Sequence, residues 1–150
     1  MNVIVVGVDY SDGAKAALRF ALEEAKLRQA KLRAVHAWQF SGHLGAPGLE
    51  GSYPGFGGEL EVMRGAAEAE FEAALREFAA GTPGVEVERR IVEGSPAGVL
   101  VEESRGADLL VVGSRGRGGF AGLLLGSVSQ QCAQHAACPV VIVHGNRKET

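Results

Sequence analysis

Disulfide-forming cysteines, an excess of basic residues and long apolar runs are all missing from this chain of 150 residues. Its two cysteines, Cys132 and Cys138, are too few for a disulfide framework and are not spaced as a CxxC pair, so we expect buried structural thiols in a reducing compartment. Fifteen Lys and Arg against eighteen Asp and Glu give a formal net charge of −3, which offers no electrostatic footprint for nucleic acid. The opening apolar run, from Val3 to Val8, is too short for a signal peptide or a membrane span. We therefore expect a cytoplasmic protein with neither nucleic-acid nor membrane partners.

Common catalytic patterns are also absent. The chain has no Walker motif ending in Gly-Lys-[Ser/Thr] and no G-x-S-x-G elbow, and its four histidines show no metal-ligand spacing. These absences argue against a P-loop NTPase, a serine hydrolase of the elbow type and a histidine-bound metal site. They predict that any enzymatic activity is weak.

What the sequence does have is an alternation of short apolar runs with segments of helical periodicity. A continuous run such as Val3 to Val8 is typical of a strand buried on both faces of a parallel sheet. The predicted strands are 3–8, 32–38, 85–91, 108–112 and 139–144, and the predicted helices are 14–25, 60–78, 96–105 and 127–137. Ser11 and Ser95 are predicted helix N-caps. The order β-α-β-α-β-α-β-α-β predicts one α/β domain over residues 1–150, with an open parallel sheet and helices on both faces.

Two segments depart from this regular alternation. Residues 40–58 carry seven glycines and two prolines without any period, and we interpret them as a long flexible loop, whose role as a lid or a simple insertion stays open. Residues 85–91 alternate apolar with charged side chains, which predicts a strand near a sheet edge with one wetter face.

The glycine-rich segment from Gly113 to Ser127 is the most informative part of the chain, because it joins an apolar strand to a helix. Glycine allows a ligand to approach the backbone closely, and free N–H groups at a helix start bind anions. Arg115 and Arg117 add positive charge, and Ser127 and Ser129 add hydroxyl donors. The segment therefore predicts a cradle for a polyphosphate, and a plain surface loop with solvated arginines is the alternative.

The spacing Gly113-x2-Gly116-x9-Gly126-Ser127 resembles the nucleotide motif G-x2-G-x9-G-[ST] of universal stress proteins. The resemblance covers nearly the whole chain and includes Asp9 after the opening strand and Cys138-Pro139 before the last one. It implies a doubly wound, adenine nucleotide alpha hydrolase-like fold with strand order 3-2-1-4-5. In such folds ligands bind at the carboxyl ends of the strands where the order reverses, here between the first and fourth strands.

Residue roles follow from this resemblance. It implies that Asp9 contacts the adenosine portion of ATP, that the backbone of Ala37 meets the adenine edge, and that Gly113 lies by the ribose. It further implies a phosphate site formed by Arg115, Gly116, Gly126, Ser127, Val128 and Ser129. Tyr10 stands where many relatives have glycine, so the first turn could be more crowded. Asp9 could assist Mg²⁺ but is also a plausible helix cap, and for Trp38 core packing competes with base stacking.

The resemblance also implies an ATP-binding regulatory module in stress response, without catalytic residues of its own. A slow ATP hydrolase and a dimeric interaction protein that binds no nucleotide are the alternatives. The last strand, including Val140 to Val143, is nearly all apolar and would lie at a sheet edge, where an exposed apolar strand invites pairing. Relatives pair through this strand, so we expect a homodimer with a two-fold interface.

Overall fold

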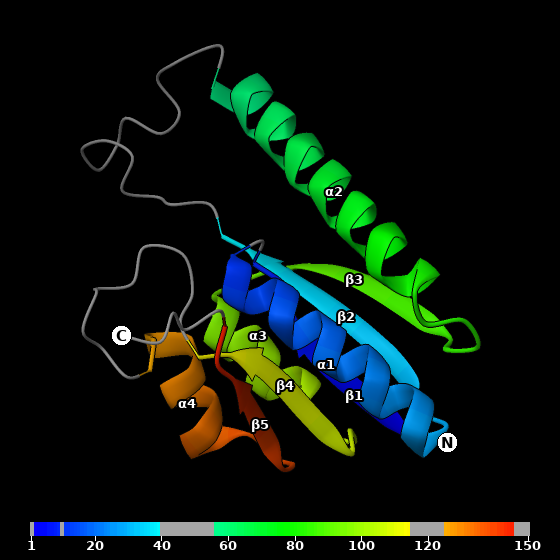
Figure 1. Ribbon diagram of the computed structural model, residues 1–150. Helices are drawn as coiled ribbons and strands as arrows, with labels where there is room; N and C mark the ends of the chain where they lie inside the picture. Colours follow the sequence, from blue (N-terminus) through cyan, green and yellow to red (C-terminus); the bar gives the residue numbers. More distant parts are fainter. Residues whose placement is uncertain (1, 10, 40–55, 115–124, 146–150) are drawn as a thin grey trace, which may run out of the picture.

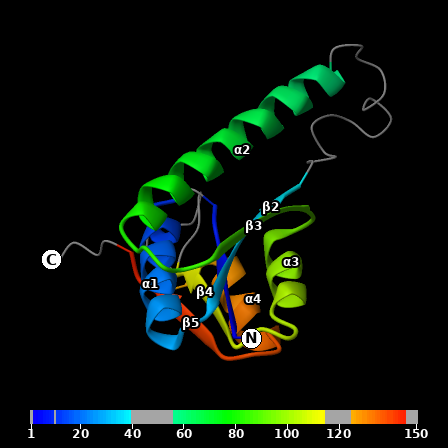
Figure 2. The same ribbon diagram turned by 90° about the vertical axis from the view of Figure 1, so that its right-hand side faces the viewer.

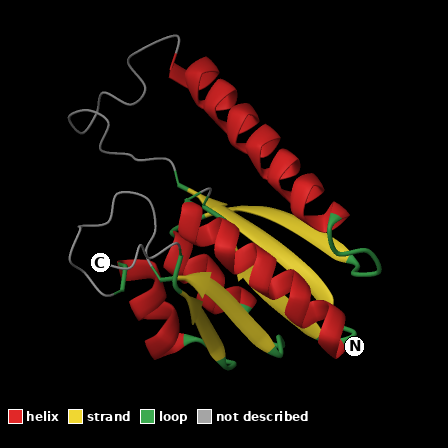
Figure 3. Cartoon of the chain, in the orientation of Figure 1, coloured by secondary structure: helices red, strands yellow, loops and turns green. Residues whose placement is uncertain are grey.

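The computed structural model describes residues 2–9, 11–39, 56–114 and 125–145, with the backbone alone at 12, 56–64 and 67. Strands and helices alternate along the chain (Figures 1 and 3). The elements are β1 (Val3–Gly7), α1 (Asp12–Arg28), β2 (Lys31–Trp38), α2 (Phe56–Ala80), β3 (Val87–Glu93), α3 (Pro96–Glu103), β4 (Leu109–Gly113), α4 (Ser127–His135) and β5 (Val140–Val143). This is the predicted order of elements.

The five strands form one sheet in the order β3-β2-β1-β4-β5, and every neighbouring pair is parallel. At the centre, Val5 of β1 pairs with Arg33 of β2 on one side and with Leu110 of β4 on the other. The strand order implied by the family resemblance is therefore confirmed. The order reverses between β1 and β4, because β2 and β3 lie on one side of β1 and the later strands lie on the other.

Helices cover both faces of the sheet, as Figure 2 shows with the sheet between α1 and α3. Ile4 and Val6 of β1 point into a core shared with α1 and with Phe71 of α2, whereas Val5 points into a second core with α3 and α4. Successive side chains of a strand point to opposite faces, so both faces of β1 must be apolar to be buried. This explains the unbroken apolar run, and each fully buried Val or Ile contributes about 1.5–3 kcal/mol.

Charged pairs cover the edge of the sheet at β3, as predicted for a strand with a wetter face. Arg33 Nε of β2 donates to Glu88 Oε1 at 2.8 Å, and Lys31 Nζ lies 3.4 Å from the same oxygen. Arg90 reaches Glu103 of α3 at 3.3 Å. Charges of this kind discourage pairing of an edge strand with another chain.

Several boundaries differ from the sequence prediction by one to four residues, among them those of α2 and β3. Helix α2 begins at Phe56, so residues 56–58, predicted to be part of the loop, are helical, and residues 40–55 lie outside the described part of the chain. The glycines at 57 and 58 disfavour a helix by about 1 kcal/mol each, but a helix of 25 residues can absorb that cost. Strand β3 runs from Val87 to Glu93 and so starts and ends two residues later than predicted.

In the described ranges, none of the helices combines the length and the apolar character needed to span a bilayer.

Candidate functional site

The candidate site lies where β1 and β4 end, at the reversal of strand order. In parallel sheets the carboxyl ends of all strands meet at one edge, and the helices that follow them begin there. Helix α1 follows β1 directly, and α4 follows β4 after the glycine-rich segment. The starts of both helices therefore border the ends of these two strands.

Asp9 organises the turn between β1 and α1. Its Oδ1 accepts hydrogen bonds from the backbone N–H of Ser11 at 3.0 Å and from the Ser11 hydroxyl at 2.5 Å. The Ser11 Oγ in turn accepts from Ala14 N at 3.1 Å, which confirms Ser11 as the N-cap of α1. One carboxylate oxygen of Asp9 thus supports the cap, and the other, Oδ2, is the atom with which Asp9 could meet a ligand.

Gly113, at the end of β4, lies against the first turn of α1. A Cβ placed on Gly113 would be 2.9 Å from the carbonyl carbon of Gly13, 3.0 Å from its oxygen and 3.3 Å from Ala14 N. These are backbone atoms, which cannot swing aside as a side chain can. The absence of a side chain at position 113 therefore allows the end of β4 and the start of α1 to pack in direct contact.

Ser114 and Gly126 form the base of the glycine-rich segment. The N–H of Ser114 donates to Val143 O of β5 at 2.9 Å, which extends the sheet by one bond beyond Gly113. The carbonyl of Ser114 accepts from Gly126 N at 2.6 Å and from the Ser129 hydroxyl at 2.8 Å. The two ends of the segment are thus joined directly, and residues 115–124 between them, including Arg115 and Gly116, lie outside the described residues.

Helix α4 begins without a side-chain cap. Gly126 is its N-cap residue and contributes no capping side chain, and the first bond within the helix runs from Gln130 N to Gly126 O at 3.0 Å. A helix leaves its first N–H groups without partners inside the helix, here those of Ser127, Val128 and Ser129. Together with the helix dipole, such groups form an anion-binding site. Ser127 is exposed and Val128 is half-buried, whereas Gly126 and Ser129 are buried, so this helix start is accessible at its first two residues.

Ala37 lies near the end of β2, and its backbone groups face the β1 side of that strand. Val35 O accepts from Val8 N, and Trp38 O accepts from Gly94 N beyond β3. Backbone groups of successive strand residues point alternately to the two sides, so Ala37 points the same way as Val35. Because the β1–β2 register ends at Gly7, the amide and carbonyl of Ala37 face the region just past the end of β1.

His36 belongs to the core, as predicted for it. The residue is 9% exposed, its Nδ1 lies 2.7 Å from Val8 O, and its ring meets Phe71 edge to face at 6.0 Å between centroids. Because a carbonyl only accepts, Nδ1 carries the proton in this bond. His36 therefore fixes the residue that precedes Asp9 and links the turn to α2.

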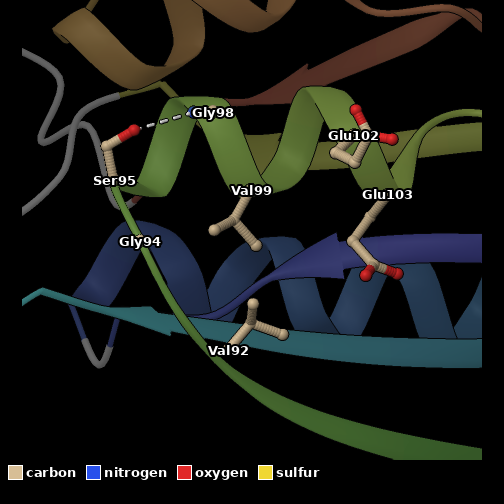
Figure 4. A pocket seen from close by; sticks show the side chains of 7 residues that line it. All are labelled: Val92, Gly94, Ser95, Gly98, Val99, Glu102 and Glu103. Carbon is tan, nitrogen blue, oxygen red and sulfur yellow. Dashed lines mark hydrogen bonds between the residues drawn. The ribbon is translucent and has the colours of Figure 1, made fainter.

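A separate cavity of about 260 Å³ lies between α3 and β3 (Figure 4). Val92 and Val99 face each other across it, and Ser95 sits at one end, where its hydroxyl accepts from Gly98 N at 3.2 Å and caps α3. Glu103, on its wall, is paired with Arg33 and Arg90. This cavity lies at the β3 edge, two strands away from β1, and we assign it no part in the candidate site.

The structure thus connects several predicted site residues through contacts. Asp9 is joined through Ser11 to the start of α1, which touches Gly113, and Ser114 joins Gly113 to Gly126 and the start of α4. Sequence reasoning missed Ser114 and Gly13, whose contributions come from backbone atoms that no residue type announces. Cys132 is buried, as expected, and burial raises its pKa to about 11, whereas Cys138 is only half-buried, contrary to the expectation. The described residues contain no cluster of three or more His, Cys, Asp or Glu suited to a metal ion.

Comparison with protein families matches residues 1–144 to the model described as the universal stress protein family. A universal stress protein of Methanocaldococcus jannaschii is 33% identical over 150 residues, which cover 97% of this chain and 84% of that protein. A universal stress protein of Mycolicibacterium smegmatis is 37% identical over 140 residues, which cover 93% of this chain. The chain spans 45% of the length of that relative, so it corresponds to less than half of such a protein.

Solved structures with the same fold include the universal stress protein UspA from Lactobacillus plantarum, with a TM-score of 0.81 and 26% identity over 95% of this chain and 97% of that one. A universal stress protein in complex with cAMP has a TM-score of 0.67 and 30% identity over 95% and 96% of the two chains. A universal stress protein from Archaeoglobus fulgidus in complex with dAMP has a TM-score of 0.66 and 25% identity over 95% and 98%.

Proposed function

Because this chain belongs to the universal stress protein family, we propose that it is a regulatory module that binds an adenine nucleotide, with ATP as its ligand. Two related structures hold adenine nucleotides, cAMP and dAMP, which supports the base. The choice of a triphosphate rests on this chain's own glycine-rich segment, whose length and two arginines suit a longer anion than a single phosphate.

The observation that carries the proposal is the uncapped start of α4. Helix α1 begins beside the same strand ends, but its first turn is already bonded to Ser11 and bordered by the carboxylate of Asp9. Helix α4 begins at Gly126 with no side-chain cap. Of the two positive helix ends, only that of α4 is left without a counter-charge of its own among the described residues, and it is where the phosphates would bind.

The adenosine portion would lie on the other side, toward β1 and β2. Asp9 keeps Oδ1 for Ser11 and would use Oδ2 to accept hydrogen bonds from the nucleoside. Ala37 would offer its backbone amide and carbonyl to the adenine edge, a pairing that any side chain at position 37 permits. With the adenosine toward β1 and β2 and the phosphates at the start of α4, the negative side chain of Asp9 would lie away from the phosphates. The positive end of the α4 helix dipole would lie beside them. Mg²⁺ would accompany ATP mainly through the phosphates, because one carboxylate holds it weakly.

We also propose a cytoplasmic homodimer that pairs through β5. Val140 to Val143 form an edge strand of four apolar residues, each half-buried. Natural proteins usually protect an apolar edge strand, because its unpaired backbone groups can pair with another chain. Sedimentation velocity would detect the dimer, and Ile142→Lys, which places a charge on the paired strand, should yield monomers.

Slow ATP hydrolysis is the competing function, and phosphate release during the experiment below would reveal it.

Thermal unfolding with and without nucleotide tests ATP binding. At about one hundred times the dissociation constant, ATP·Mg²⁺ should add roughly 2.7 kcal/mol to the free energy of unfolding. For a domain of this size that raises the melting temperature by about 5–10 °C. GTP·Mg²⁺ should give a smaller shift, because the Ala37 backbone would be matched to adenine. Equal shifts with both nucleotides would contradict the adenine site, and no shift with either would contradict nucleotide binding.

Gly126→Val and Gly126→Ala form a matched pair for the phosphate site. Gly126 has φ −77° and ψ 171°, an extended conformation that any residue adopts, so a valine here causes no backbone strain. Both side chains are poor caps, and they differ mainly in volume. We expect the valine variant to lose the ATP-induced shift and the alanine variant to keep part of it. Because Gly126 is buried, the larger side chain also lowers stability, so each shift is measured against the same variant without nucleotide. A full ATP shift in the valine variant would show that the phosphates bind elsewhere.

A further inference from the structure

Ser129 is the only described serine of α4 whose side chain is buried, and its environment differs from that of a ligand-binding hydroxyl. It is 1% exposed, whereas Ser127, two residues earlier, is exposed. Its Oγ lies 2.8 Å from Ser114 O and 3.0 Å from Gly126 O. Both neighbours are carbonyls, which only accept, so the single hydroxyl proton of Ser129 is directed to the backbone.

The two acceptors have different structural consequences. A bond to Gly126 O is local to the first turn of α4, since the residues are three apart. A bond to Ser114 O joins residues fifteen apart and ties the end of β4 to α4 across the whole glycine-rich segment. The shorter distance, to Ser114 O, favours the bond between segments. The same carbonyl accepts from Gly126 N at 2.6 Å, so both of its lone pairs are used. We call this contact of Ser114 with Gly126 and Ser129 the junction.

The junction is anchored on both sides. Ser114 N donates to Val143 O, so the residue that carries the shared carbonyl is held in the sheet by β5. On the helix side, the Gln130 side chain donates to Leu125 O at 3.3 Å, which holds the residue before Gly126 against the first turn. A fixed Ser114 carbonyl therefore fixes where α4 starts relative to Gly113.

We propose that Ser129 is a positioning residue for the phosphate site, whose hydroxyl holds the start of α4 against Ser114 and does not bind phosphate itself. This inference rests on the proposed function for its consequence in nucleotide binding. The N–H groups at the start of α4 can act together on an anion only if the helix start stays in place beside the end of β4. Holding it there before the ligand arrives removes part of the ordering cost of binding.

Removing the hydroxyl should loosen the junction before it affects any ligand contact. In Ser129→Ala, Ser114 O keeps only the bond from Gly126 N. The free energy needed to separate the start of α4 from Ser114 then falls by the net value of one hydrogen bond. The Gly126 amide should therefore exchange with solvent about five-fold faster in the nucleotide-free protein. If only the closed form binds, the association rate for ATP falls in proportion to the population of that form, and by about the same factor where the open form predominates, while dissociation changes little. A lost direct contact would instead mainly raise the dissociation rate.

The experiment compares Ser129→Ala, Ser129→Thr and Ser127→Ala with the unchanged chain. Amide exchange at Gly126 is measured by NMR without nucleotide, and the binding of a fluorescent methylanthraniloyl ATP is followed by stopped flow. We expect Ser129→Ala to combine faster Gly126 exchange with slower association, and only the exchange of Gly126 is compared with that of Ser127→Ala. Ser129→Thr keeps a hydroxyl and should restore both, whereas Ser127→Ala should leave Gly126 exchange unchanged.

Unchanged Gly126 exchange in Ser129→Ala, or equally fast exchange in the threonine variant, would overturn the proposal, because the hydroxyl would then not hold the junction. Faster exchange with unaltered binding rates would make Ser129 purely structural and would overturn its positioning role. Failure of the unchanged chain to bind the ATP analogue would overturn the proposed function instead, and the exchange measurement would still decide whether Ser129 holds the junction.

Discussion

Gly113→Ala adds one methyl group at the closest approach between β4 and α1. The new Cβ would lie 2.9 Å from the carbonyl carbon of Gly13 and 3.0 Å from its oxygen, against an optimal separation between carbon atoms of about 3.5–4.0 Å. Because the obstructing atoms belong to the backbone of the first turn of α1, relief requires the helix start to move by roughly half an ångström or more. Such overpacking costs about 1–3 kcal/mol.

Gly65→Ala is the matched control, because it makes the same chemical change where space is free. Gly65 lies inside α2, is exposed, and has no heavy atom within 4 Å of an added Cβ. Alanine in place of glycine inside a helix should stabilise it by about 0.5–1 kcal/mol. The two variants should therefore change the free energy of unfolding in opposite directions.

Urea unfolding followed by circular dichroism measures both effects. At about 2 kcal/mol, Gly113→Ala should also lower the melting temperature by about 4–8 °C. Both variants should keep the dependence of the unfolding free energy on urea, since the surface exposed on unfolding hardly changes. A Gly113→Ala variant as stable as the unchanged chain would show that β4 and the start of α1 are farther apart than described, and would remove the geometric basis of the candidate site.

Two further predictions concern side chains away from this contact. The hydrogen bond from Arg33, aided by its charge and that of Lys31, lowers the pKa of Glu88. A carboxyl group whose pKa is lowered by folding stabilises the protein at pH values above its pKa in the unfolded state. That stabilisation is lost as the pH falls through its pKa in the folded state, so Glu88→Gln should lower the free energy of unfolding by about 0.5 kcal/mol at pH 7 and by progressively less at acidic pH. A loss of stability that does not depend on pH would contradict this. Burial raises the pKa of Cys132 to about 11, and burial together with Asp108 raises that of Cys138. A thiol reagent at pH 8 should therefore modify half-buried Cys138 slowly and Cys132 only on unfolding, and prompt reaction of a Cys138→Ser variant would refute it.

The architecture could be predicted because its causes are local in the sequence. The apolar run of β1 indicates burial on both faces, and Ser11 and Ser95 indicate helix starts, which the bonds to Ala14 N and Gly98 N confirm. The strand order itself came from the family resemblance, since periodicity gives the order along the chain and not the order in the sheet.

Other features depend on contacts between distant residues. Nothing local to Gly113 shows that it packs on Gly13, one hundred positions away, and every residue has the carbonyl that Ser114 uses to join β4 to α4. Sequence reasoning placed the Ser129 hydroxyl among the phosphate ligands because serine beside a helix start is a common donor. Its burial could be known only once α4 was placed against the sheet. The predicted phosphate contacts of Arg115 and Gly116, which lie outside the described residues, stay predictions.

An amide-resolved NMR titration with ATP·Mg²⁺ tests most directly whether the uncapped start of α4 holds the phosphates. We expect saturable shifts of the backbone amides of Ser127, Val128 and Ser129, together with that of Ala37. Adenosine alone should shift Ala37 and leave the three amides of α4 unmoved. If ATP shifts the Ala37 amide but none of the three at the start of α4, or shifts none of the four, the phosphate site proposed here does not exist.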